Sequence, residues 1–170
     1  TMVLELKETK QSFTFTGIAS PPVPSLLRSF SAPVVLDYDY SDDQLAFLLA
    51  HDSDPFNRWE AGQRLATRRL LQLADTDIAA DFSYTPSAQD QLLASALGKL
   101  LRDVSLDAAF RDLVLTLPSE TMLAEEVDVI DPQALHRARR ALRKYLAQNL
   151  RADFLEAYQK NHTPGAYRPD

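Results

Sequence analysis

The pattern of apolar and polar positions changes near residue 40 and divides the chain into two regions. Before that point, apolar and β-forming residues come in short runs at 3–6 and 13–16, separated by the polar stretch KETKQS. Residues 34–40 end in a strict alternation of acidic side chains with apolar or aromatic ones. Such runs are typical of strands, so we expect a β-hairpin followed by a third strand.

After residue 40 the apolar residues recur at helical spacing. Several expected helix starts pair a Ser, Thr or Asp cap with a following proline or acidic residue, as in Asp54-Pro55 and Asp131-Pro132. A cap of this kind supplies an acceptor for amide groups that the first helical turn leaves without a partner. The pattern predicts a helix that Ser41 caps and that has His51 in its last turn. It also predicts helices over 54–73 and 86–102, one from Ser105 or Asp107 to Leu117, a short one over 119–126 and a long one over 131–161.

These elements predict a mainly α fold, in which a short β-strand segment precedes an α-solenoid-like array of stacked antiparallel helices. The expected boundary lies at Tyr40-Ser41, with a β part over residues 1–40 and a helical part over 41–170. Two or three strands are not stable unless they pack against something. We therefore expect the β part to belong to a larger β domain that continues upstream.

Composition narrows the classes of protein. The 170 residues suit about one domain, and an apolar content of 45% allows a buried core. The formal charge of −6 argues against a general nucleic-acid binder, because an acidic surface repels phosphate. The absence of cysteine excludes disulfides, thiolate metal sites and cysteine nucleophiles. No apolar run is long enough to span a membrane, and the four glycines lie too far apart for a nucleotide-binding loop.

The stretch 37–54 is the main candidate for a metal site, because it holds six aspartates and one histidine. A calcium loop that starts at Asp37 lacks the required Gly and Glu at its sixth and twelfth positions. His51 has no second histidine four residues away, as a helical zinc site needs. Structural roles explain the group more simply: Asp37 and Asp39 on the solvent face of a strand, Asp42 and Asp43 in a first helical turn, His51 in that helix's last turn, and Asp54 as a cap.

Acidic pairs elsewhere are candidates for acid–base catalysis, which needs two carboxylates in different environments. Their polar settings indicate surface charge and helix caps instead; the pairs are Glu125-Glu126, Asp128-Asp131 and Asp75-Asp77. We therefore expect this chain to hold no catalytic, cofactor-binding or metal-binding residue.

Residues 137–151 carry six cations and no acid. On a helical wheel the cations take one side and the apolar residues the other. Such a face can bind a nucleic acid, or it can pair with carboxylates of neighbouring elements. The acidity of the rest of the chain favours pairing.

Aromatic residues gather near the expected boundary between the β part and the helical part. They can stack on a ligand, but large aromatic side chains more often join two subdomains by burying area, and we expect that role. The residues are Tyr38, Tyr40, Phe47, Phe56 and Trp59. Gly62, inside the expected helix 54–73, disfavours a helix by about 1 kcal/mol relative to Ala and so indicates a close approach of another element.

The stretch PVPSLLRSFSAPVVLDYDYSDDQLAFLLAHDSDPFNRWEAGQRLA at residues 22–66 resembles the bacterial aminopeptidase N family of zinc-dependent alanyl aminopeptidases. The resemblance continues through LTLPSE at 115–120 and IDPQALHRARRAL at 130–142, and so covers essentially the whole chain. It implies that the chain matches the end of a small β-sandwich and the beginning of a C-terminal helical domain. The family's GxMEN and HExxH motifs are missing here, so no catalytic or zinc-binding position is carried over.

The resemblance implies a non-catalytic fragment of a cytosolic zinc aminopeptidase that releases N-terminal amino acids from short peptides. The fragment would scaffold and help enclose the active-site cavity, and zinc would be held elsewhere in the parent enzyme. The expected joint is Tyr38, Tyr40, Phe56 and Trp59, and the expected wall is helices 54–73, 86–102 and 131–161.

The expected partners are the remaining domains of the same polypeptide, with no nucleic acid and no membrane. The isolated fragment is expected to self-associate through exposed strand edges. The alternative is an independent helical-solenoid interaction module that binds a protein through the 137–151 face.

Overall fold

The structure is a computed structural model that describes residues 2–165. Within these residues the chain forms seven α-helices and one 3-10 turn but no strand, so the predicted mainly α fold is confirmed. The elements are η1 (Arg28–Phe30), α1 (Asp42–His51), α2 (Pro55–Ala74), α3 (Ala88–Arg102), α4 (Ala108–Leu115), α5 (Glu120–Ala124), α6 (Pro132–Asn149) and α7 (Arg151–Asn161).

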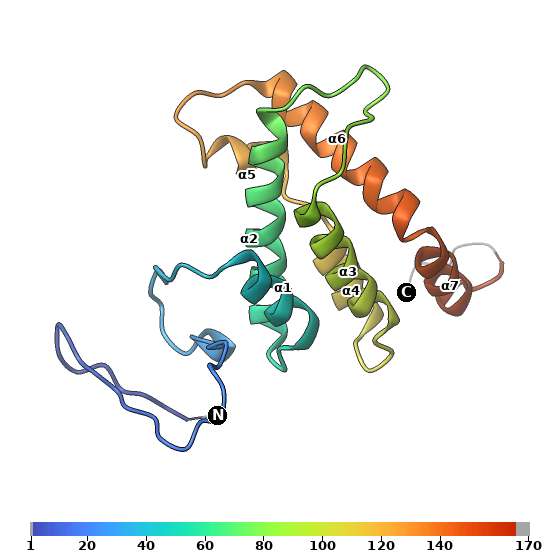
Figure 1. Cartoon of the computed structure of the whole chain (residues 1–170). Helices are drawn as coiled ribbons and strands as arrows, with labels where there is room; N and C mark the ends of the chain where they lie inside the picture. The colour runs from blue at the N-terminus through green and yellow to red at the C-terminus, as the bar shows by residue number, and fades with distance from the viewer. Residues whose placement is uncertain (1, 166–170) are drawn as a thin grey trace.

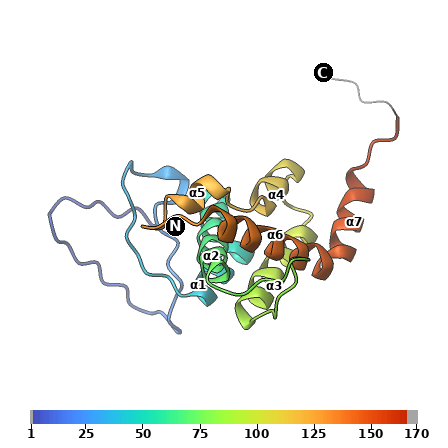
Figure 2. The same ribbon diagram turned by 90° about the horizontal axis from the view of Figure 1, so that it is seen from above.

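The central element is α2, which packs against α1, α4, α5 and α6, while α3 lies between α1 and α7. The N-terminal segment and α7 lie at opposite ends of the array (Figures 1 and 2). No helix in the described part combines the length and the apolar character that a membrane crossing needs. The core is rich in leucine; its fully buried leucines are Leu45, Leu49, Leu65, Leu70, Leu73, Leu93, Leu100, Leu123 and Leu142.

Most predicted helix starts are confirmed by the side chains that cap them. Ser41 caps α1 in a capping box, and Asp54 caps α2 ahead of Pro55. The predicted cap of α6, Asp131, is also present, and α4 and α5 are capped by Asp107 and Ser119. The start of α3 was predicted at residue 86 but lies at residue 88, because Ser87 and Asp90 form a capping box there. A side-chain acceptor for the first-turn amides thus outweighs the proline as a start signal.

The single long helix predicted over 131–161 is wrong, because the chain bends at Leu150 and forms two helices. The φ of −102° and ψ of 17° at Leu150 are not helical. Its side chain is buried against Gly98 of α3, where a Cβ on the glycine would lie 3.2 Å from Leu150 Cδ2. The bend brings α7 onto α3, where Arg102 and Asp153 form an ion pair at 2.8 Å.

The strands predicted over residues 3–6, 13–16 and 34–40 do not form in the described part of the chain. A strand needs a neighbour whose amide and carbonyl groups complete its ladder, and β propensity does not supply that neighbour. Several apolar side chains in these segments are exposed, among them Val3 at 84% and Val35 at 98%.

The close approach predicted at Gly62 is confirmed. A Cβ on Gly62 would lie 3.2 Å from Leu49 Cδ1 of α1 and 3.6 Å from Val114 Cγ1 of α4. The missing side chain therefore allows α2 to contact both neighbours closely.

A buried ion pair joins α2 to the start of α3. Arg69 donates from Nε and Nη2 to the two carboxylate oxygens of Asp90 at 2.7 and 2.8 Å, and the Asp90 side chain is 0% exposed. The Tyr84 hydroxyl donates to the same carboxylate at 3.0 Å, and burial raises the pKa of Tyr84. Burial also acts to raise the pKa of Asp90, but hydrogen bonds from Arg69 and Ser87 outweigh it and lower that pKa.

We expect Asp90→Asn to lower the free energy of unfolding by about 3 kcal/mol at pH 7, because it leaves the Arg69 charge buried without its counter-ion. The folded pKa of Asp90 lies below its ordinary value of 3.8, so the carboxylate stabilises the fold above pH 3.8 and loses this effect as the pH falls through the folded pKa. The difference between the two proteins should therefore shrink at low pH. Urea unfolding of both at pH 7 and at about pH 3 measures this.

The matched control is Asp128→Asn, since Asp128 is exposed. It should change the free energy of unfolding by no more than about 0.5 kcal/mol. An equal loss in both variants, or a loss at Asp90 that stays constant with pH, would contradict the assignment.

Candidate functional site

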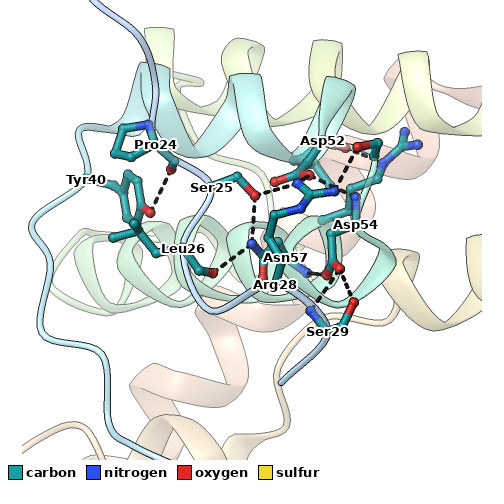
Figure 3. Close-up of polar contacts among 12 residues, drawn as sticks. Pro24, Ser25, Leu26, Arg28, Ser29, Tyr40, Asp52, Asp54 and Asn57 are labelled. Carbon is teal, nitrogen blue, oxygen red and sulfur yellow. Dashed lines mark hydrogen bonds and ion pairs between the residues drawn. The ribbon is translucent and has the colours of Figure 1, made fainter. Parts of the chain in front are cut away.

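The segment of residues 23–30, here called the strap, lies across the corner between α1 and α2 (Figure 3). Its side chains and backbone groups face polar residues of that corner, and residues 23–28 are half-buried. The strap connects the N-terminal segment to the helices. It is therefore the place where the two parts of the chain are coupled.

Arg28 makes the strongest polar contacts of the strap. Its Nη1 donates to Asp52 Oδ1 at 2.6 Å and to Ser25 Oγ at 2.7 Å, and its Nη2 donates to Ser53 Oγ at 2.8 Å. The Asp52 side chain is only 1% exposed, and its Oδ1 also accepts from the amide of Asp54 at 2.8 Å. Charge-assisted bonds of this length are stronger than neutral ones, so Arg28 fixes the strap to the end of α1.

Asp54 and Asn57 hold the strap from the start of α2. The Asp54 carboxylate accepts from the Asn57 amide at 3.0 Å, and from the Ser29 amide and hydroxyl at 2.9 and 3.1 Å. Burial acts to raise the pKa of Asp54, but the hydrogen bonds from Asn57 and Ser29 outweigh it and lower that pKa. The Asn57 Nδ2 donates to Ser25 Oγ and to the Leu26 carbonyl, both at 2.9 Å.

The strap backbone is strained. Leu27, Ser29 and Phe30 have φ values of 52°, 56° and 55°, in the left-handed region that favours glycine. Each such residue costs roughly 1 kcal/mol or more and persists only where its surroundings hold it. The hydrogen bonds that Arg28 and Asn57 donate, and those that Asp54 accepts, keep these strap residues in that conformation.

The aromatic residues of the expected joint form two groups in the structure. The Phe30 ring of the strap lies against that of Phe56, with centroids 4.0 Å apart and planes inclined by 51°, and the Phe56 ring lies 5.8 Å from that of Trp59. Tyr40 is buried and donates its hydroxyl to the Pro24 carbonyl at 2.8 Å, and its burial raises the pKa of that hydroxyl.

The other two aromatic residues differ in position. The Tyr38 ring lies 4.3 Å from that of Tyr40, so Tyr38 belongs to the joint. Phe47 does not, because it is 52% exposed and lies beside His51, with ring centroids 5.2 Å apart.

Two arginines of α2 hold the residues that follow the strap. Arg64 donates to the Tyr38 carbonyl at 2.8 Å, and Arg68 donates to the Tyr40 carbonyl at 2.7 Å. Arg68 also forms ion pairs of 3.3 Å with Asp39 and Asp42. These carboxylates are thus engaged by a cation, and the joint extends along α2.

The remaining candidates for a metal site lie apart from one another in the structure. Asp43 lies in the first turn of α1 and His51 in its last turn. Within residues 2–165, no group of three or more His, Asp or Glu side chains is placed to hold a metal ion. His136 contacts Glu120 at 2.9 Å, which is a pair of side chains and not a ligand set.

The basic face of α6 only partly pairs with carboxylates. Lys144 contacts Asp81 at 3.3 Å, as expected. Arg139 instead donates to the Pro118 carbonyl at 2.9 Å, and Arg140 lies over the Phe82 ring at 5.0 Å. The general expectation of carboxylate partners is wrong for these two arginines, because the nearest surfaces are a carbonyl-rich turn and an aromatic side chain.

Sequence reasoning missed the polar residues that hold the strap. Ser25, Arg28, Asp52 and Asn57 lie up to 32 residues apart, and their pairing has no local periodicity to reveal it. The available signal was the run PSLLRSF, where one Arg stands in a half-apolar, non-helical segment ahead of an Asp-rich corner.

Comparisons with known proteins match the chain to two family models and to several aminopeptidases. Residues 42–170 match the family described as "Domain of unknown function (DUF3458_C) ARM repeats", and residues 1–39 match "Domain of unknown function (DUF3458) Ig-like fold". The chain is 38% identical to aminopeptidase N of Escherichia coli over 160 residues, which are 94% of this chain and 18% of that protein. It is 40% identical to aminopeptidase N of Caulobacter vibrioides over 150 residues, which are 88% of this chain and 17% of that protein.

A solved structure is also similar. Aminopeptidase A of Legionella pneumophila, in complex with aspartic acid, is 31% identical, with a TM-score of 0.71, over 92% of this chain and 18% of that one. This chain thus spans less than a fifth of the length of the proteins it matches.

We expect Asn57→Ala to free the strap without unfolding the helices, because Asn57 holds it by two hydrogen bonds and its own backbone cap stays intact. Two lost bonds of about 1 kcal/mol each predict a more than tenfold rise in local opening. Chymotrypsin cleavage within residues 26–30, followed by mass spectrometry, measures this opening.

The matched control is Asn149→Ala, whose side chain bonds only to the Tyr145 carbonyl in the described structure. Cleavage of the strap at the parental rate in Asn57→Ala would contradict the assignment, and so would equally fast cleavage inside α1 and α2.

Proposed function

Because this chain belongs to the family of the DUF3458_C ARM-repeat domain, we propose that it is a non-catalytic part of a larger zinc aminopeptidase. The observation that carries the proposal is the alignment of about nine-tenths of this chain with less than a fifth of each aminopeptidase N. The parent enzyme would release N-terminal amino acids from short peptides in the cytosol. It would do so with a metal-activated water held outside this chain.

Several carboxylates among residues 2–165 have structural roles, which favours a non-catalytic part. Asp54 caps α2, and Asp90 pairs with Arg69. No three potential ligands converge within residues 2–165. Helices α2, α3, α6 and α7 would instead form part of the wall around the parent's active-site cavity.

We further propose that residues 1–40 belong to a β-sandwich and residues 41–170 to the helical domain. An Ig-like sandwich takes about 100 residues, so the 39 matched here need strands from elsewhere in the parent. The strap and Arg64 and Arg68 would then fix the sandwich to the helices. No observation favours an independent interaction module that uses the 137–151 face.

We expect the chain produced by itself to show no hydrolysis of an alanine amide with zinc added, and the full-length parent to hydrolyse it. In the parent, Arg58→Met should lower thermal stability and leave the bound zinc per chain unchanged, because Arg58 is a buried structural residue. Hydrolysis by the chain alone, or loss of zinc on this substitution, would refute the supporting role.

The isolated chain should also self-associate, because Val3, Leu6 and Val35 are 84%, 71% and 98% exposed. Sedimentation velocity over a hundredfold range of concentration measures this. The variant Val3→Lys with Val35→Lys should shift the distribution toward the monomer. A chain that sediments as a monomer throughout the range would contradict the expectation.

A further inference from the structure

A hollow of about 180 Å³ lies between α1 and α3, two helices that pack against each other (Figure 1). Its buried or half-buried lining is apolar and consists of Ala46, Ala50, Leu92 and Ala96. Its rim carries exposed side chains of both charges, a hydroxyl group and an aromatic ring; these are Asp43, Phe47, His51, Ser95 and Lys99. One hollow thus combines an apolar floor with an acidic and a basic group.

The two charges lie at opposite ends of the hollow, because α1 and α3 run in the same direction. Arg58 establishes this direction, since it contacts the last carbonyls of α1 and also Asp103, which ends α3. Asp43 lies in the first turn of α1, whereas His51 and Lys99 lie in the last turns of α1 and α3. Asp43 and His51 are eight residues apart, so about 12 Å of helix separates the acidic end from the basic end.

The polar groups of the rim are not used by the fold. Among residues 2–165, the side chains of Asp43, Ser95 and Lys99 make no hydrogen bond or ion pair. His51 lies against the Phe47 ring, with centroids 5.2 Å apart. Phe47 is the largest apolar side chain of α1, yet it is 52% exposed. A ligand in the hollow would cover this ring and pair with both charges.

We propose that the hollow binds a short peptide of two or three residues whose two ends are free. The peptide's ammonium group pairs with Asp43, its carboxylate pairs with Lys99, and an apolar side chain covers Phe47. An extended peptide spans about 3.3–3.6 Å per residue, so three residues reach about 10 Å, which suits two charged side chains that bend inward over the hollow.

The spacing of the charges excludes simpler ligands. A free amino acid is too short, because its ammonium and carboxylate groups are attached to the same carbon atom. A polyanion would meet the Asp43 carboxylate at one end, and like charges repel. The site requires no catalytic residue, so the proposal goes beyond the proposed function and does not rest on it.

The first test is a titration of this chain with the peptide D-Ala-Leu-Ala, whose D-residue protects it from aminopeptidases, followed by ¹H–¹⁵N NMR. The amide signals of Phe47, Ser95 and Ala96 should shift together and saturate. Acetylation of the peptide's amino end, or amidation of its carboxyl end, should each weaken binding about three- to fivefold, the loss expected for one exposed ion pair. No shift at millimolar peptide, or shifts confined to other parts of the chain, would overturn the proposal.

Two variants test which end pairs with which residue. In Asp43→Asn, acetylation of the peptide should cause no further loss, while amidation still weakens binding; in Lys99→Met the reverse should hold. Glu126→Gln and Lys10→Met replace exposed residues that do not line the hollow, so they should bind like the unchanged chain. Each comparison uses two peptides on one variant, so a general loss of stability cannot produce this pattern. An acetylation loss that persists in Asp43→Asn refutes the pairing.

The full-length parent tests whether the hollow is open in the complete protein. Irradiation with D-Ala-photoleucine-Ala should label α1 or α3, as mass spectrometry detects, and the probe with both ends blocked should label them several-fold less. Absence of label on both helices would overturn the proposal, since another part of the polypeptide would then cover the hollow. Hydrolysis of an alanine amide is measured separately, so an inactive parent that is labelled refutes the proposed function but not this one.

Discussion

The buried guanidinium of Arg58 determines how α1, α2 and α3 meet, and the rest of the structure depends on it. Its Nε and Nη2 donate to the carbonyls of Leu49 and Ala50 at 3.0 and 3.2 Å, in the last turn of α1. Its Nη1 reaches Asp103, which ends α3, at 3.3 Å. The last carbonyls of a helix have no partner within that helix, and leaving them buried without one is unfavourable. One side chain of α2 therefore completes α1 and positions it beside α3.

The strap depends on the geometry that Arg58 creates. Because α1 ends beside the start of α2, Asp52 and Asp54 lie close together and both face the strap (Figure 3). Their carboxylates can then hold Arg28 and Ser29 in a backbone conformation that non-glycine residues avoid. The strained strap and the corner between α1 and α2 therefore stabilise each other. Opening either one breaks the hydrogen bonds between them, and these bonds offset the backbone strain of the strap.

The helical part could be read from the sequence because its signals are local. Ser41, Asp54 and Asp131 each cap a helix a few residues away, and a cap acts through its own neighbouring amides. The bend at Leu150 could not be read, since it is set by contact with Gly98 some fifty residues earlier. The predicted strands were wrong for the same reason. A strand forms only where another strand pairs with it, and the β propensity of its own residues does not supply that partner. The strap was missed because its partners lie 24 to 32 residues apart and form no periodic pattern.

Three buried or half-buried guanidinium groups recur at the joints between elements. Arg28 joins the strap to α1, Arg58 joins α2 to the ends of α1 and α3, and Arg69 joins α2 to the start of α3. Apolar contacts stabilise these joints without strict direction, so helices that meet only through leucines can shift along each other. A planar guanidinium with several directed donors accepts few arrangements. The directional contacts of these three guanidinium groups therefore fix the positions of the elements relative to one another more narrowly than a larger apolar core would.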